Sequence, residues 1–308
     1  MKKALVIGGK GKVGNYLLPM LVQSGYEVTA VTRGNTPYYR DVPELKQVKE
    51  LHMDRKDPEF LKTIAAGEWD VVVDMLLFYC EDLEKLIDAL RDKTGHLVVC
   101  GSLWLHGASD LVPVREEDCL TPPDRYGKAK LAMTRLLERE WRENRFPGTI
   151  VHPGHICAPG HVIINPQGNV NPQVFEKLRT GQELLLPGDG LATLHHVHAE
   201  DVAGIMHAAI LAGEISFGES FHAASAQAMS LAGYARHTAS LFGQEARLIF
   251  APWEEFARAV GPEDAALTLE HISRSPAASM DKVRRVLNYT PRSAYETVDE
   301  NILNMQRR

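Results

Sequence analysis

The sequence predicts a doubly wound α/β fold, in which helices cover both faces of a parallel sheet, together with a smaller C-terminal α/β lobe. Three observations predict it. The apolar run Ala4–Ile7 leads at once into a glycine-rich loop and a helix with apolar residues at helical spacing. Further short apolar runs follow, separated by helical patterns, as in successive βαβ units. The apolar run Trp69–Leu77 is typical of a strand buried on both faces.

Composition and charge exclude several classes of protein. The 308 residues carry a formal net charge of −6, which argues against a dedicated nucleic-acid binder. No apolar run reaches the roughly 18 residues that a membrane span needs. Residues 1–3 lead straight into the first strand, so we expect no signal peptide. We therefore expect a cytoplasmic protein with neither nucleic acid nor membrane as its partner.

The glycine-rich loop predicts a site for the pyrophosphate of a dinucleotide. It reads GGKGKVG between the first strand and the first helix. Bare backbone N–H groups and the positive end of the helix dipole attract an anion there, and glycines permit the tight turn. The alternative is a glycine-rich surface turn. We expect the cofactor to lie against Gly8, Gly11, Lys12, Val13 and Gly14.

The end of the second strand, Glu27–Thr32, indicates which dinucleotide binds. NAD-selective proteins place a carboxylate there to hold the ribose 2′-OH, but this chain has Thr32 followed by Arg33. Arg33 can pair with a 2′-phosphate, and Lys10 and Lys12 add positive charge nearby. The pattern favours NADP over NAD. Arg33 as an ordinary solvated arginine is the alternative.

The middle of the first half continues the alternation of strands and helices. After the loop Gly34–Pro43 and a third strand at Val48–Leu51, Asp54 is either an acceptor for the adenine amino group or the cap of the next helix. The pattern then predicts a helix at Glu81–Arg91 and a fifth strand at His96–Cys100. That strand ends at Ser102, and such strand ends face the ligand crevice.

Tyr126 and Lys130 are four residues apart in a helical pattern, so they lie on one helix face. A neighbouring ammonium and a positive nicotinamide ring stabilise a phenolate, so we expect the pKa of Tyr126 to be lowered. Lys130 can also hold the nicotinamide ribose, and Ser102 can donate to the substrate oxygen. The alternative is that Tyr126 and Lys130 are two solvated helix residues.

The sequence resembles the extended, sugar-epimerase-like branch of the short-chain dehydrogenase/reductase superfamily, the NAD-dependent epimerase/dehydratase family. The resemblance covers nearly the whole chain. The segments that carry it are GGKGKVG at 8–14, GSLWLHG at 101–107, YGKAK at 126–130, HPGHICAP at 152–159, VHAEDVA at 197–203 and LNYTPR at 287–292.

The resemblance implies a Rossmann fold and a tightly held nicotinamide dinucleotide. It implies Tyr126 as the acid/base, Lys130 as its partner and Ser102 as the group that orients the substrate carbonyl or hydroxyl. It also implies cofactor contacts at Pro153 and Ile156. Members usually form homodimers through the helix that carries Tyr126 and the helix before it.

Several positions depart from the family pattern. His152 and His155 stand where the family has Arg and Asn, and the end of the fourth strand reads DMLL at 74–77 rather than small residues. Leu194 replaces an arginine that often binds a diphosphate, and Arg274 is a weak substitute. The dehydratase triplet is missing at Ser102, so we do not expect sugar dehydration. These departures weaken the inference that the substrate is a nucleotide sugar, but they do not weaken the inference of the fold.

The remaining residues predict the second lobe. We expect a dinucleotide-binding domain at 1–160 with a returning segment at about 190–212, and an interleaved substrate-binding lobe at 161–308. Its predicted elements are a loop at 160–171, a strand at 183–186, and helices at 174–178, 231–241, 253–259, 280–287 and 295–305. A substrate then lies between the lobes.

Histidines of this region are candidates for the substrate site. His155 and His195 are possible donors to substrate together with Ser102, against the alternative of plain polar loop residues. We expect no metal, because neighbouring residues of the run 195–198 point to opposite faces and cannot all ligate one ion.

The sequence therefore predicts an NAD(P)-dependent oxidoreductase or epimerase that acts at a hydroxyl or carbonyl carbon of a small, sugar-like molecule. Two alternatives stay open. One is a non-catalytic, NADP-binding sensor or RNA-associated relative. The other is a reductase of a nonsugar carbonyl compound.

Overall fold

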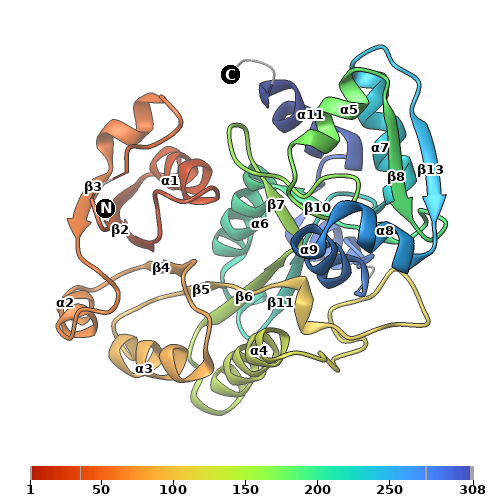
Figure 1. The fold of residues 1–308 in the computed structure, drawn as a ribbon. Coiled ribbons are helices and arrows are strands. Elements are labelled where there is room, and N and C mark those ends of the chain that lie inside the picture. Colours follow the sequence, from red (N-terminus) through yellow and green to blue (C-terminus); the bar gives the residue numbers. More distant parts are fainter. Residues whose placement is uncertain (1, 35, 275, 306–308) are drawn as a thin grey trace.

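A seven-stranded parallel sheet forms the centre of the computed structural model, which describes residues 2–34, 36–274 and 276–305 (Figure 1). The strand order is β3-β2-β1-β4-β5-β6-β11, and every neighbouring pair is parallel. The predicted fold class is confirmed. The strands are β1 Lys2–Ile7, β2 Tyr26–Thr32, β3 Lys49–His52, β4 Val71–Asp74, β5 Leu97–Cys100, β6 Gly148–Pro153 and β11 Ser220–Ala223.

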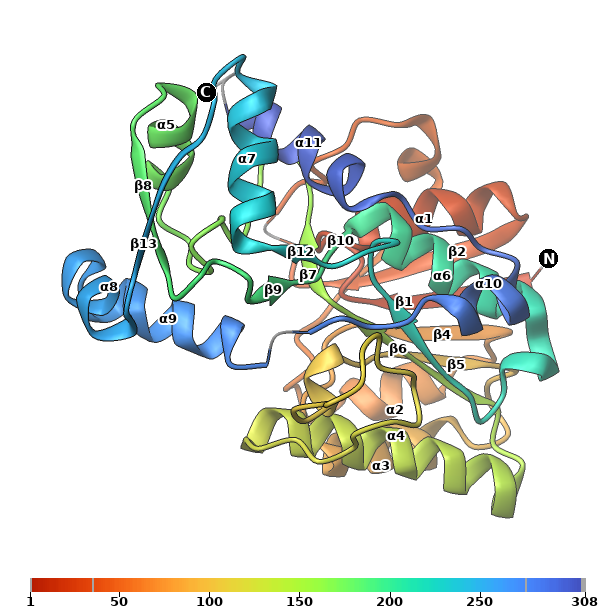
Figure 2. The same cartoon turned by 90° about the vertical axis from the view of Figure 1, so that its right-hand side faces the viewer.

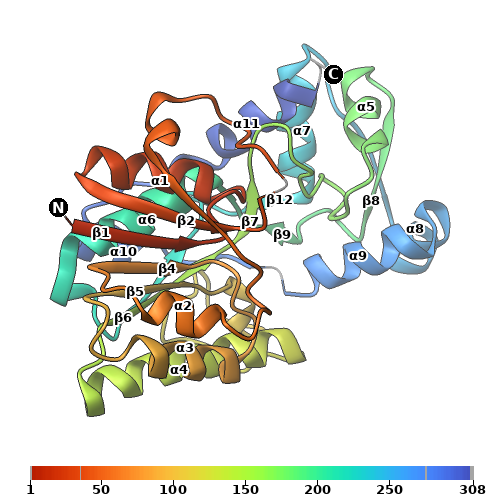
Figure 3. The ribbon, with the colours of Figure 1, turned by 90° about the vertical axis from the view of Figure 1, so that its left-hand side faces the viewer.

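Helices cover both faces of this sheet, as Figures 2 and 3 show. One layer contains α1 Gly14–Gln23, α6 Ala199–Ala212 and α10 Asp281–Leu287. The other contains α2 Phe60–Ala65, α3 Cys80–Leu90 and α4 Arg125–Asn144. Strand β1 shows why both layers are needed. Its alternate residues Ala4 and Val6 join one buried cluster, whereas Leu5 and Ile7 join the other.

A third buried cluster lies beside the sheet and joins most of the remaining elements, while α8 packs on α9 and β8. Figure 1 shows these elements grouped at the right of the view. They are α5 Gln173–Arg179, β8 Glu183–Pro187, α7 Leu231–Leu241, β13 Arg247–Ala251, α8 Trp253–Val260, α9 Pro262–Ile272 and α11 Ala294–Asn304. Two short strand pairs lie between the cluster and the sheet: β7 His155–Cys157 with β10 His196–His198, and β9 Thr193–Leu194 with β12 Met229–Ser230.

Some elements differ from the sequence-based expectation. The sequence patterns did not indicate β6, β11, β13 or α9. Strand β11 contains the buried polar residues Ser220 and His222, and the His222 ring is hydrogen-bonded inside the protein, so a hydropathy pattern does not reveal this strand. The division into two lobes stays a prediction, and the structure adds that β11 and α10 lie against the large sheet.

The carboxyl ends of β1, β4, β5 and β6 meet at one edge of the sheet. The glycine loop follows β1, Ser102 follows β5, and Pro153 ends β6. This edge therefore holds the predicted site. Among the described residues, no helix has the length and apolar character needed to cross a bilayer.

Candidate active site

A cavity of about 210 Å³ lies at the carboxyl ends of β5 and β6. Ser102, Tyr126, Pro153, His155 and His195 all contribute to its wall. The structure therefore brings together residues that are far apart in the sequence and that were predicted as catalytic, cofactor-binding or substrate-binding.

Ser102 and Tyr126 line the same cavity, and Ser102 influences the phenol of Tyr126. Burial raises the pKa of the Tyr126 phenol, and the hydrogen bond from Ser102 opposes that effect by lowering the pKa. The Ser102 hydroxyl oxygen also accepts a hydrogen bond from the Trp104 backbone N–H at 3.2 Å. The serine is thereby oriented toward the tyrosine by the chain itself.

Lys130 lies one helical turn beyond Tyr126 and is almost fully buried. Its Nζ donates to the carbonyl oxygens of Leu77 at 2.6 Å and Cys100 at 3.0 Å, and lies 5.5 Å from the centre of the Tyr126 ring. Burial lowers the pKa of Lys130. Burial of the phenol is the largest effect on the pKa of Tyr126 in the structure and raises it, and the lowering expected from this ammonium together with a nicotinamide ring stays a prediction.

The start of α4 explains how Tyr126 reaches the cavity. The Asp124 carboxylate caps the helix by accepting the Gly127 N–H at 2.9 Å. A Cβ on Gly127 would lie 2.2 Å from the Trp104 carbonyl oxygen, so only glycine permits this approach. The Tyr-Gly sequence therefore lets the helix start directly against the segment that follows β5.

The two predicted substrate histidines have different environments. His195 donates from Nε2 to the Ser225 carbonyl oxygen at 2.9 Å and accepts the Ala278 N–H at Nδ1 at 3.1 Å. Both of its ring nitrogens are used, so the prediction that His195 donates to substrate is wrong for this arrangement. In contrast, both ring nitrogens of His155 are buried without a hydrogen-bond partner among the described residues. Burial holds the pKa of His155 well below its usual value, so its ring is neutral.

The glycine loop has the close-packed form that a dinucleotide pyrophosphate requires. Gly8 has a φ of +90°, and a Cβ on Gly14 would lie 2.2 Å from the Gly9 carbonyl oxygen. A Cβ on Gly11 would lie 3.2 Å from the Gly8 carbonyl oxygen. Val13 is the N-cap of α1, so the N–H groups that follow it open the helix. These residues fit a nicotinamide dinucleotide with its pyrophosphate at the start of α1.

The basic side chains near this loop differ in whether groups of the protein already bind their charge. Lys10 is paired with Glu50 at 2.9 Å. Lys12 donates to the carbonyl oxygens of Ile156 at 3.3 Å and Val162 at 3.2 Å, so its side chain holds the neighbouring loop. Arg33 is exposed and has no ion-pair partner in the described parts of the chain. Of the three predicted positive charges, Arg33 is therefore the one available to a phosphate.

Two acidic residues beside the crevice are already engaged. The Asp54 carboxylate accepts the Lys56 N–H at 2.8 Å in a turn. The N-cap of α2 is Glu59, so the predicted alternative that Asp54 caps this helix is wrong. Asp74 is fully buried at the end of β4 and is ion-paired with Arg55. Its charge is thus compensated within the protein.

Trp104 lines the cavity beside Tyr126, and Arg274 packs against the Trp104 ring. The sequence did not indicate Trp104 as a wall residue, and it offered Arg274 only as a weak diphosphate contact. The Trp104 ring meets the Tyr126 ring edge-on at 5.7 Å. The Arg274 guanidinium lies 3.8 Å from the centre of the Trp104 ring and is ion-paired with Asp124. Trp104 lies within the segment 101–107, which was a usable signal, whereas Arg274 is 150 residues from Asp124 and no local pattern connects them.

No group of three or more histidine, cysteine, aspartate or glutamate side chains is arranged to hold a metal ion within the residues that the structure describes.

Comparison with known proteins agrees with this architecture. The chain is 32% identical over 215 residues to the chloroplast stem-loop binding protein of 41 kDa b from Arabidopsis thaliana, which covers 66% of this chain and 53% of that protein. It is 26% identical over 232 residues to 2′-dehydrokanamycin reductase from Streptomyces kanamyceticus, which covers 72% of this chain and 62% of that protein. The matches thus span less than two thirds of these relatives.

A solved structure covers nearly the whole chain, and a family model covers most of it. The epimerase from Methanothermobacter thermautotrophicus superposes with a TM-score of 0.74 at 20% identity, over 99% of this chain and 92% of that one. Residues 4–221 match the model of the NAD dependent epimerase/dehydratase family. With the glycine loop, the parallel sheet and this match in agreement, the chain belongs to the NAD-dependent epimerase/dehydratase family.

Proposed function

We propose that the chain is an NAD(P)-dependent oxidoreductase or epimerase that acts at a hydroxyl or carbonyl carbon of a sugar-like molecule. One observation carries the proposal. Ser102 and Tyr126 line one cavity, and the Lys130 ammonium lies one turn beyond Tyr126 on the same helix. This is the arrangement that proton transfer to or from a substrate oxygen requires.

The residues of the chain divide the work of such a reaction. A bound nicotinamide ring supplies the centre that accepts or returns a hydride. Tyr126 takes the proton from a substrate hydroxyl during oxidation and returns it to the carbonyl oxygen during reduction. Ser102 donates to the same oxygen and orients it. Lys130 uses two of its three N–H donors on Leu77 and Cys100, which leaves the third for a ribose hydroxyl.

We propose that NADP binds in preference to NAD. Thr32 places no carboxylate at the end of β2, and Arg33 beside it is exposed and without an ion pair among the described residues. The contribution expected from Lys10 is smaller, because Glu50 compensates its charge. The preference therefore depends on Arg33.

The substrate end of the cavity fits a small, neutral and polar group. The cavity has a volume of about 210 Å³, and His155, whose neutral ring carries one donor and one acceptor without a partner among the described residues, lies in its wall. A hydroxyl group can both accept and donate a hydrogen bond. The named activity of one relative, a reductase of a dehydro compound, supports a reaction at a carbonyl.

A panel of hydroxylated and keto sugars, with nonsugar ketones as the comparison set, tests this proposal. The absorbance of reduced nicotinamide and the products are followed together. A net change in absorbance identifies a dehydrogenase or reductase, and product without net change identifies an epimerase. Conversion of the nonsugar ketones alone would contradict the sugar-like substrate, and no conversion in the whole panel would contradict the proposal.

A second candidate function is RNA binding, which is favoured by one observation. The relative with 32% identity is named as a stem-loop binding protein. The net charge of −6 and the presence of both Tyr126 and Lys130 favour the enzyme. A gel-shift titration with a stem-loop RNA over a salt series separates the two. Tight, salt-dependent binding together with unchanged nicotinamide turnover in Tyr126→Phe would favour RNA binding.

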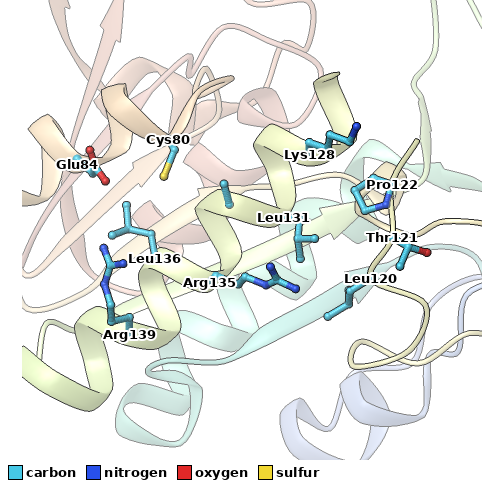
Figure 4. Close-up of a pocket in the computed structure, with 11 residues that line it drawn as sticks. Cys80, Glu84, Leu120, Thr121, Pro122, Lys128, Leu131, Arg135, Leu136 and Arg139 are labelled. Atoms are coloured by element: carbon cyan, nitrogen blue, oxygen red, sulfur yellow. The ribbon is translucent and has the colours of Figure 1, made fainter. Parts of the chain in front are cut away.

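We also propose that two copies of the chain associate through α3 and α4. A cavity of about 540 Å³ lies on this face, away from Tyr126, and Figure 4 shows its lining side chains. Glu84 of α3 and Arg135 and Arg139 of α4 line it together with apolar side chains. Opposite charges on one face are complementary to a second copy of the same face when two copies pack about a two-fold axis.

A further inference from the structure

We infer that His152 is a positioning residue of the catalytic site, a neutral imidazole that connects the end of β5 to α4 and thereby aligns Ser102 with Tyr126. The inference rests on the proposed function, because alignment matters only if Ser102 and Tyr126 act together. The imidazole belongs to β6 and lies directly behind the catalytic residues.

Hydrogen bonds on both sides of the ring carry this inference. The Ser102 backbone N–H donates to His152 Nδ1 at 3.1 Å, so this nitrogen holds the lone pair and the proton of the neutral ring is on Nε2. Nε2 lies 3.4 Å from Thr134 Oγ1. The Thr134 hydroxyl in turn donates to the Lys130 carbonyl oxygen at 2.9 Å. The donors thus run in one direction, from Ser102 through His152 and Thr134 to Lys130.

The absence of a side chain at Gly101 is independent evidence for the position of the His152 ring. A Cβ on Gly101 would lie 2.1 Å from His152 Nδ1. The Gly101 N–H donates to the Val151 carbonyl oxygen at 2.6 Å, which joins the end of β5 to β6. The imidazole therefore occupies the space that a side chain at 101 would take, and it reaches the next N–H along the chain.

The surroundings keep the ring neutral. His152 is 1% exposed, and burial holds its pKa well below the usual value. The nearby charged and titratable groups act in the same direction: His222 on β11, His106 after the turn that follows β5, Lys130 on α4 and Lys282 on α10 all disfavour a positive ring. A protonated ring would have no lone pair for Ser102, so neutrality is a condition of the connection.

This connection acts on the hydroxyl of Ser102. The Trp104 N–H already donates to Ser102 Oγ, so the hydroxyl hydrogen is free to point toward Tyr126. With His152 holding the Ser102 backbone, the direction of this hydrogen is set before substrate arrives. Loss of the connection should therefore affect turnover more than substrate binding.

Three substitutions test the role, with turnover measured on a substrate from the panel above. His152→Phe removes both bonds, whereas His152→Gln offers an amide oxygen to Ser102 and an amide N–H to Thr134. We expect His152→Phe to lower kcat about tenfold, the effect of about one hydrogen bond, with KM changed less than about twofold. His152→Gln should retain most of the activity. The alkaline limb of the pH–rate profile should move to higher pH in His152→Phe and in Ser102→Ala, because both remove what lowers the pKa of Tyr126.

His96 provides the matched control. His96 is also a buried histidine, and its Nε2 lies 2.8 Å from Thr149 Oγ1. It precedes β5, at the end of the strand opposite to Ser102. His96→Gln should leave kcat and the pH profile unchanged. If His152→Phe does not fold, Thr134→Val removes the far partner at nearly constant volume and should lower kcat at least about twofold.

A measurement without substrate separates this inference from the proposed function. Nitrogen-15 spectra of the imidazole, assigned by their loss in His152→Gln, should show the proton on Nε2 and no titration near neutral pH. A proton on Nδ1, a ring that titrates near pH 6.5, or equal activities of the Phe and Gln variants would overturn the inference. If instead Ser102→Ala and Tyr126→Phe both keep full turnover, the proposed function fails, whatever the tautomer.

Discussion

Tyr126 shows how far a residue pattern predicts chemistry. The spacing of Tyr126 and Lys130 placed both on one helix face, and the structure brings them to Ser102 as predicted. In the structure the pKa of Tyr126 is raised, mainly by burial of the phenol, which depends on residues distant in the sequence. The prediction that His195 donates to substrate failed because both of its ring nitrogens bond to backbone groups from distant segments. Residue identity predicts which groups can react, but their environment comes from the fold.

Arg33 should decide between the two dinucleotides. Arg33→Ala should weaken NADP binding about tenfold or more, because a charge-assisted contact with a phosphate is lost. NAD binding should change less than about twofold. Titration of both cofactors by fluorescence measures the two constants. Arg236→Ala, an exposed arginine on α7, is the control and should affect neither cofactor. Equal weakening of NAD and NADP by Arg33→Ala would contradict the preference.

At the scale of elements, strands with strong apolar runs and helices with clear periodicity were predictable. Helix α7 was predicted at its observed bounds, Leu231–Leu241. Strand β4 was predicted too long, because the chain after Asp74 turns away from the sheet when the Asp74 carboxylate accepts the Leu76 N–H. Strand β11 was missed because its polar residues are buried and bonded. Local patterns fail where partners from other elements satisfy polar groups.

The start of α1 should be sensitive to a single methyl group. Gly14→Ala should weaken dinucleotide binding about tenfold and lower the free energy of unfolding by about 1–3 kcal/mol, because the Cβ overlaps the Gly9 backbone. Gly25→Ala, at the other end of the same helix, meets open space at a φ of +82°. It should cost about 1 kcal/mol of stability without changing binding. Chemical denaturation and cofactor titration check both; normal binding by Gly14→Ala would count against the loop as the pyrophosphate site.

The face of α3 and α4 should hold the dimer together. Reversing the charges of Arg135 and Arg139 to glutamate puts like charges beside Glu84 on the same face. We expect the double variant to sediment as a monomer where the unchanged chain sediments as a dimer. Arg236→Glu on α7 is the control and should stay dimeric. A monomeric unchanged chain, or a double variant that remains dimeric, would contradict this interface.

At the scale of the whole molecule, distant segments meet around the cavity. Arg274, after α9, pairs with Asp124 at the start of α4, and β11 completes the sheet beside β6. Such contacts between distant segments could not be predicted from one sequence, because no local spacing encodes them. The fold class, the glycine loop and the helix that carries Tyr126 and Lys130 could be predicted, because each depends on patterns of neighbouring residues. The contacts that bring these parts together at one cavity depend on the complete fold.

Buried histidines should make the whole molecule sensitive to acid. Burial lowers the pKa of His96 to about 3 and those of His195 and His196 to about 4. Below pH 6.5 the unfolded chain binds protons that the folded chain does not, so stability falls as the pH drops from 6.5 toward 4. At pH 5.5 each of these three histidines lowers the free energy of unfolding by about 1.4 kcal/mol, which makes about 4 kcal/mol for the three together. Denaturation curves at pH 7.5 and 5.5 measure the difference, and equal stabilities would show that these rings are not buried neutral.

The central claim is that Tyr126 transfers the proton while a nicotinamide dinucleotide is bound. Its most direct test is the turnover of nicotinamide, with a substrate from the panel, by the unchanged chain, by Tyr126→Phe and by Tyr79→Phe, whose exposed ring lies outside the cavity. We predict that Tyr126→Phe loses at least about two orders of magnitude in kcat, still binds the cofactor, and that Tyr79→Phe keeps its rate. A Tyr126→Phe variant that turns over at the rate of the unchanged chain would contradict the account.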